Sequence, residues 1–96
     1  MTTFYTREEV QEHNIKESCW VIANNIVYDA TSYINKHPGG KFAILSKAGE
    51  DVTKHFEWHS KHAKKIWEKH MLNKGDFSSE IWKYFYLTKW YNIFFK

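Results

Sequence analysis

The sequence has little cysteine, little proline and no long apolar run. Cys19 is the only cysteine among the 96 residues, which excludes an intramolecular disulfide and suits a reducing compartment. A membrane helix needs about 20 mostly apolar residues, whereas the longest uncharged stretch near the C-terminus is Trp90–Phe95. The first residues are too polar for a signal peptide. We therefore expect a soluble, cytoplasmic protein with no transmembrane anchor.

Sequence signatures of catalysis are also missing. There is no nucleophile–base set, phosphate loop or nucleotide fingerprint, so we expect no independent enzyme activity. The net charge is +3, but it is unevenly spread. Residues 1–35 hold two basic and five acidic groups, and residues 36–96 hold 12 and six. This excess favours an acidic partner or an anionic surface. It is too dispersed for nucleic acid, and no base-reading motif accompanies it.

Aromatic residues, in contrast, are abundant. At 43% hydrophobic and 19% aromatic the chain can bury a core, and its length suits one domain. We place that domain at residues 1–76 and expect a monomer. Residues 77–96 form an aromatic tail, which we expect to pack on the domain. The alternatives are contact with a membrane surface or with another protein.

Local patterns predict several short elements. Thr6 and Glu9 form a capping box that starts a helix near Arg7, running to about His13. Asn24-Asn25 suits a tight hairpin turn between two β-prone runs, Trp20–Ala23 and Ile26–Tyr28. Further helices are predicted up to Lys36 after a Thr31-Ser32 cap, and over Lys41–Ala48, Val52–Glu57 and Lys61–Met71, the last capped by Ser60.

His37-Pro38-Gly39-Gly40 is the strongest local motif. Proline fixes the backbone beside the histidine, and glycines allow a flat ligand to approach the chain closely. Taken alone, the tetrapeptide fits an ordinary loop with a surface histidine equally well.

The motifs around it occur in a fixed order. They are Phe4-Tyr5-Thr6-x-x-Glu9-Val10, Cys19-Trp20-Val21-Ile22, Val27-Tyr28-Asp29-Ala30-Thr31, the His37–Gly40 element, Ala48-Gly49-Glu50-Asp51-Val52-Thr53, and Phe56 with His59-Ser60. Over residues 4–75 this series resembles the cytochrome b5 family. The resemblance implies an α+β fold in which a small twisted sheet and two helical hairpins form a slot for non-covalent haem b. Covalent attachment is excluded, because C-x-x-C-H is absent.

The resemblance also implies roles for individual residues. His37 and His59 match the two iron ligands. Ser60 matches the residue that hydrogen-bonds a haem propionate, although it also fits a plain N-cap. The matching cofactor-binding positions are Tyr33, Pro38, Ala43, Ile44, Val52, Phe56, Ala63 and Ile66.

Two axial histidines would leave the iron no open position, which favours outer-sphere electron transfer over oxygen activation. We expect a one-electron carrier. By family habit, its donor would be a flavin-dependent reductase of the cytochrome b5 reductase type, and its acceptor an iron enzyme such as a desaturase or hydroxylase.

The second ligand is the least secure match. His37 and His59 are 22 positions apart, one or two fewer than is usual in the family, so His62 and His55 are rivals. In a continuous helix His55, His59 and His62 would share a face at spacings that suit zinc. A zinc or other metal-binding module is therefore the alternative function. A haem-free fold that binds a sterol is less favoured, because such relatives lose the histidines.

The charge around the expected slot also departs from the family. Its members commonly carry acidic residues there, which dock basic partners. Here Lys41 and Phe42 follow the glycines, and Lys61, Lys64 and Lys65 follow Ser60. A partner that selects a strongly acidic face would therefore bind weakly, unless these lysines are simply a solvated surface.

Overall fold

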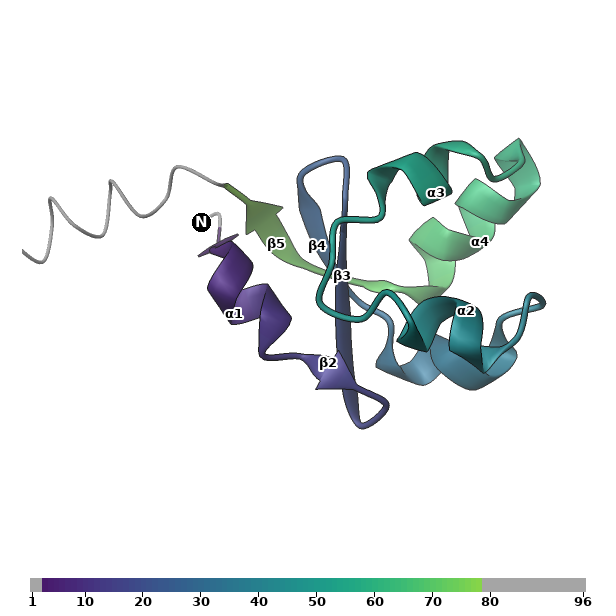
Figure 1. Ribbon diagram of the computed structural model, residues 1–96. Coiled ribbons are helices and arrows are strands. Elements are labelled where there is room, and N and C mark those ends of the chain that lie inside the picture. The colour runs from purple at the N-terminus through teal and green to yellow at the C-terminus, as the bar shows by residue number, and fades with distance from the viewer. Residues whose placement is uncertain (1–2, 79–96) are drawn as a thin grey trace, which may run out of the picture.

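The computed structural model describes residues 3–78, which are built on a five-stranded sheet (Figure 1). Its strands are β1 (Phe4–Tyr5), β2 (Asn14–Ile15), β3 (Ser18–Ala23), β4 (Ile26–Asp29) and β5 (Leu72–Phe77). Their order in the sheet is β1-β5-β4-β3-β2. β1 and β5 are parallel, and every other neighbouring pair is antiparallel. The predicted α+β class is confirmed.

Five helical segments accompany the sheet. They are α1 (Arg7–Gln11), the 3₁₀ helix η1 (Thr31–Lys36), α2 (Lys41–Leu45), α3 (Thr53–Glu57) and α4 (Lys61–His70). Figure 1 shows α1 on one side of the sheet and α2, α3 and α4 on the other. No helix within residues 3–78 is long and apolar enough to cross a bilayer.

Alternation along β3 divides the core in two, because successive strand residues face opposite sides of a sheet. Cys19, Val21 and Ala23 belong to the larger cluster, which includes residues of η1, α2, α3 and α4. Trp20 and Ile22 face the other way and pack with Val10 of α1. The larger cluster thus packs the sheet against two helical lobes, one made of η1 and α2 and the other of α3 and α4.

Several predicted local features are confirmed. The capping box is complete, with the Glu9 amide donating to the Thr6 hydroxyl at 3.1 Å. Asn24 and Asn25 adopt positive φ angles of 51° and 63° in the turn between β3 and β4. The Ser60 hydroxyl accepts from the Ala63 amide at 3.1 Å and caps α4.

Other predicted features are wrong. Thr31 does not cap η1, whose N-cap is Ala30 without a side-chain bond. The Thr31 hydroxyl instead accepts from the Cys19 amide at 2.9 Å and donates to the Asp29 carboxylate at 2.6 Å. These bonds join η1 to the β3–β4 hairpin. α2 ends at Leu45, before the expected Ala48. β1, β2 and β5 were not predicted. Of the predicted tail, only Phe77 and Ser78 lie within the described residues, and Phe77 belongs to β5.

Candidate functional site

Two histidine rings face each other between the helical lobes. His37 follows η1 in an extended conformation, and His59 lies in the short turn between α3 and α4. Their ring centres are 6.5 Å apart, with the planes inclined at 52°. Both rings are half-buried. The two residues that the sequence assigns to the iron are thus brought together from opposite lobes.

Backbone carbonyls hold both rings in the same manner. His37 Nδ1 lies 3.2 Å from the Gly40 carbonyl oxygen, and His59 Nδ1 lies 2.6 Å from the His55 carbonyl oxygen. A carbonyl can only accept, so each Nδ1 carries a proton, and in the neutral imidazole Nε2 then keeps its lone pair. This is the tautomer that a histidine ligand needs when it binds a metal through Nε2.

The separation of the rings matches a metal held between them. Bonds from imidazole nitrogen to a metal are about 2.0–2.1 Å long, and the centre of a five-membered ring lies about 1 Å beyond the bonded nitrogen. Two such ligands on opposite sides of one ion therefore place their ring centres roughly 6 Å apart. The observed 6.5 Å is close to that value.

A cavity opens on each side of this histidine pair. Each has a volume of about 310 Å³, and His37, His59 and Trp67 line both of them. A flat group centred between the imidazoles would extend into both cavities. One cavity is also lined by Val21, Ala43, Ile44, Lys47, Val52, His55 and Met71. The other is also lined by Tyr33, Pro38, Gly39, Ala63 and Ile66.

Most of the cofactor-binding residues expected from the sequence lie in the walls of these two cavities. Seven of the apolar positions assigned by resemblance line one cavity or the other. Phe56 does not line either one. It is buried behind the cavities, with its ring centre 5.0 Å from that of Trp67 in an edge-to-face contact. Phe56 therefore supports the ring of Trp67, which lines both cavities.

Trp67 lines both cavities and is one of the wall residues that sequence reasoning missed. It is buried on α4, and its ring meets those of Tyr28, Phe56 and His59 edge-on. Its Nε1 has no hydrogen-bond partner among the described residues. A buried unpaired donor costs about 1–3 kcal/mol. Its spacing of four from Ala63 was the available signal, since such residues share a helix face.

The structure confirms the N-cap interpretation of Ser60, and its contact with a haem propionate stays a prediction. Its oxygen accepts from the Ala63 amide as an N-cap, and the hydroxyl hydrogen remains able to donate to a carboxylate. The residue is exposed and adjoins His59. It lines neither of the two cavities, and capping α4 leaves its hydroxyl hydrogen for the expected propionate.

The two glycines of the motif have different tasks. A Cβ at Gly39 would lie 2.7 Å from Cε1 of the His37 ring, so only glycine leaves that ring its present position. A Cβ at Gly40 would meet nothing within 4 Å, but the residue has φ of +93°. Most side chains disfavour that backbone conformation. Gly39 therefore provides space, and Gly40 provides the turn.

The alternative metal site has no structural support. Ser60 is extended, with φ −67° and ψ 165°, so α3 and α4 are separate helices and the three histidines do not share one face. His62 is exposed and lines neither of these two cavities. Within residues 3–78 there is no group of three or more histidine, cysteine, aspartate or glutamate residues able to hold a metal ion.

Comparison with known families identifies this arrangement. The model of the "Cytochrome b5-like Heme/Steroid binding domain" family matches residues 6–86. The chain belongs to this cytochrome b5 family. The comparisons indicate non-covalent haem b as the cofactor, in a family of electron carriers.

Curated relatives include both small cytochromes and large enzymes. Cytochrome b5 of Musca domestica is 38% identical over 73 residues, which are 74% of this chain and 54% of that protein. Cytochrome b5 of Candida tropicalis is 47% identical over 70 residues, 71% of this chain and 54% of that protein. The chain thus spans about half the length of these cytochromes. An NADH nitrate reductase of Volvox carteri is 52% identical over 61 residues, 62% of this chain but only 7% of the enzyme.

Solved structures show the same fold. Cytochrome b5 of Ostreococcus tauri virus 2 has a TM-score of 0.67 at 38% identity, covering 76% of this chain and 94% of that one. Cytochrome b558 of Ectothiorhodospira vacuolata, a prokaryotic homologue of cytochrome b5, has a TM-score of 0.66 at 26% identity. It covers 76% of this chain and 98% of that one.

Proposed function

We propose that this cytochrome b5 domain is a one-electron carrier whose haem iron is bound by His37 and His59. The observation that carries the proposal is the pair of facing imidazoles, each with Nδ1 on a carbonyl and Nε2 available. When bound, the haem supplies a ferric–ferrous couple. With His37 and His59 both bound to it, the iron would have no site open for oxygen or substrate.

The chain's own residues favour fast electron exchange. The carbonyl bonds fix both rings, so the ligands do not have to reorient when the charge of the iron changes. Apolar walls would keep water from the haem, and we propose that the Ser60 hydroxyl donates to a propionate. We propose that a flavin-dependent reductase of the cytochrome b5 reductase type donates the electron. We propose a desaturase or hydroxylase as the acceptor.

Spectroscopy of the haem-titrated chain tests the ligand assignment. The wild type is expected to give a low-spin, six-coordinate spectrum in both redox states. His37→Ala and His59→Ala should each abolish it, and haem affinity should fall in a titration of the apoprotein. His62→Ala is the matched control, because its ring is exposed and lines neither slot cavity.

The outcomes separate the possibilities. Loss of the low-spin spectrum in His62→Ala, with His59→Ala unaffected, would contradict the second ligand but leave a haem carrier. A folded wild-type chain that binds no added hemin would contradict the function itself.

A further inference from the structure

The rim of the slot combines two exposed aromatic rings with lysines on both lobes. Building on the carrier function, we propose that Lys41, Phe42, Lys47, Trp58 and Lys61 form a docking surface for an acidic redox protein. We call these five residues the slot rim. The partner is defined by its negative charge and by apolar contacts. The rim itself is positively charged, opposite in sign to the acidic edge common in the family.

The aromatic part of the rim is unusually exposed. Phe42 is 72% exposed and Trp58 is 76% exposed. No other large apolar side chain within residues 3–78 is more exposed than these two. Phe42 directly precedes Ala43 and Ile44 of one cavity wall, and Trp58 directly precedes His59. The two rings thus belong to opposite lobes and are next in sequence to residues of the slot, although neither ring lines a slot cavity. Exposed aromatic side chains are typical anchors of protein interfaces.

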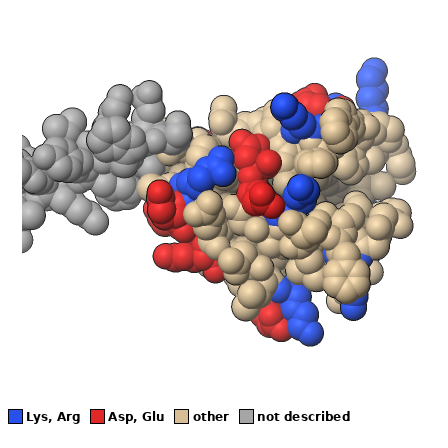
Figure 2. Space-filling view, viewed as in Figure 1, with Lys and Arg blue, Asp and Glu red and all other residues tan. Residues whose placement is uncertain are grey.

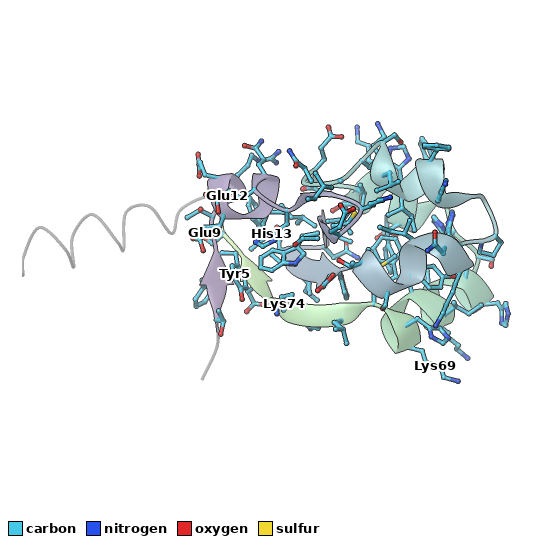
Figure 3. The ribbon with its side chains drawn as sticks, turned by 90° about the horizontal axis from the view of Figure 1, so that it is seen from below. Tyr5, Glu9, Glu12, His13, Lys69 and Lys74 are labelled. Atoms are coloured by element: carbon cyan, nitrogen blue, oxygen red, sulfur yellow. The ribbon has the colours of Figure 1, made fainter. Side chains whose placement is uncertain are left out.

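The charges of the described residues are separated along the molecule. Residues 31–71, which build η1, α2, α3 and α4, contain eight lysines and four carboxylates. The other described residues contain three basic groups and six carboxylates. Figure 2 shows acidic side chains at the α1 end and in the middle of this face, and lysines projecting from the α2–α4 end. In Figure 3, Glu9 and Glu12 lie at the α1 end, and Lys69 lies on α4. Such a dipole turns the slot toward an anionic partner.

Two rim lysines occupy positions that are locally unfavourable. Lys41 is the first residue of α2 and Lys61 the first residue of α4. The start of a helix carries partial positive charge, so a cation there is locally unfavourable. The first turns of both helices contain no acidic residue. A local cost of this kind is expected at a functional site, and an anionic partner would offset it.

Geometry favours a protein over an anionic membrane. A membrane-surface helix presents one continuous apolar face. Here Phe42 and Trp58 belong to different lobes separated by the slot, and α2 and α3 have only five residues each. A redox protein can place its own cofactor opposite the gap between the two rings. A flat lipid surface offers no electron acceptor there.

Stopped-flow kinetics at varied ionic strength tests the surface. The acidic probe is a reduced plant-type [2Fe–2S] ferredoxin, whose low reduction potential makes it a donor. The basic probe is ferric cytochrome c, which receives an electron from the reduced chain. We expect the ferredoxin rate constant to fall about tenfold as salt rises from about 10 to 300 mM. The cytochrome c rate constant should rise or stay level. The opposite ranking overturns the proposal.

Charge reversal locates the effect. Lys41→Glu with Lys61→Glu should lower the ferredoxin rate at low salt about tenfold and flatten its salt dependence. The matched control is Arg7→Glu with Lys74→Glu, which changes the net charge equally. Lys74 lies beside Tyr5 and His13, away from the slot (Figure 3). Equal effects of the two double variants overturn the rim assignment.

The aromatic rings are tested separately from the charges. Phe42→Ser with Trp58→Ser should lower the ferredoxin rate several-fold at high salt and leave the salt dependence unchanged. An unchanged rate at high salt removes the two rings from the surface and overturns the rim as defined.

Two measurements keep this proposal distinct from the carrier function. Every variant is first titrated with hemin, and its low-spin spectrum is compared with that of the wild type. If the chain binds no haem, the carrier function fails, and ferredoxin binding to the apoprotein by chemical-shift mapping still tests the rim. Sedimentation with phosphatidylserine vesicles is the competing arm. Rim-dependent vesicle binding without rim-dependent ferredoxin binding overturns the assignment to a protein.

Discussion

Replacing Gly39 by alanine should damage the haem ligand more than it damages the fold. The added Cβ would lie 2.7 Å from Cε1 and 3.2 Å from Nδ1 of the His37 ring, whereas ordinary contact begins at 3.4 Å. The ring must therefore move by 0.7 Å, the difference between 3.4 and 2.7. Metal–ligand distances tolerate only about 0.2 Å. The ring also loses its fixed position at the Gly40 carbonyl.

The expected result divides into two measurements. In the apoprotein the half-buried ring can swing aside, so the free energy of unfolding should change by less than about 1 kcal/mol. Haem affinity should fall by at least tenfold, about 1.4 kcal/mol, and the low-spin spectrum should weaken. Denaturant unfolding of the apoprotein and hemin titration measure the two effects.

Gly40→Ala is the control, because it perturbs the same turn by another route. Its Cβ would touch nothing, but φ of +93° carries a strain of about 1–2 kcal/mol for a side chain. We expect it to lower the stability of apoprotein and holoprotein alike and to retain the low-spin spectrum. A wild-type spectrum and affinity in Gly39→Ala would refute the steric argument.

Three further predictions concern the core. Burial, and then the charge of Asp29, raise the pKa of the Cys19 thiol from 9.0 to about 11. The unfolded chain therefore loses this proton at a lower pH than the folded chain does. The free energy of unfolding should fall by on the order of 2 kcal/mol between pH 9 and pH 11. Denaturant titrations should show a smaller fall in Cys19→Ala. Gly75→Ala should overlap the Thr3 carbonyl and lower stability by about 2 kcal/mol, with faster amide exchange in β1; unchanged exchange would contradict this. Trp67→Phe removes an unpaired buried N–H and should cost the apoprotein less than about 1 kcal/mol, whereas Trp67→Ala leaves a cavity and should cost about 3–5 kcal/mol in the same unfolding assay.

Features dictated by neighbouring residues were predictable from the sequence. The Thr6 and Ser60 caps and the Asn24-Asn25 turn depend on groups a few positions apart, and each was predicted at its correct residues. The pairing of His37 with His59 came from resemblance to a family, since no local pattern brings together residues 22 positions apart. The structure now shows these rings facing each other.

Features that depend on distant contacts were missed. β5 contains Asn73, Lys74, Gly75 and Asp76, a composition that disfavours strands, and it forms because both β1 and β4 pair with it. Trp67 was missed because its role depends on Phe56 and His59, which lie on another element. The Thr31 hydroxyl was assigned to a cap because its partner, the Cys19 amide, is 12 positions away.

The parallel pairing of β1 with β5 has a consequence for how the domain joins other chains. Thr3 and Asp76 are hydrogen-bonded backbone to backbone at 2.8 Å, so the two ends of the described segment leave the molecule as neighbours. Figure 1 places them across the sheet from the lobes that hold the histidines. A polypeptide fused at either point would begin on the opposite side of the sheet from His37 and His59 and would leave these histidines uncovered. The domain could therefore be joined to other domains at either end without covering the histidines. The segments of nitrate reductases that resemble this chain are likewise only 7–8% of those enzymes.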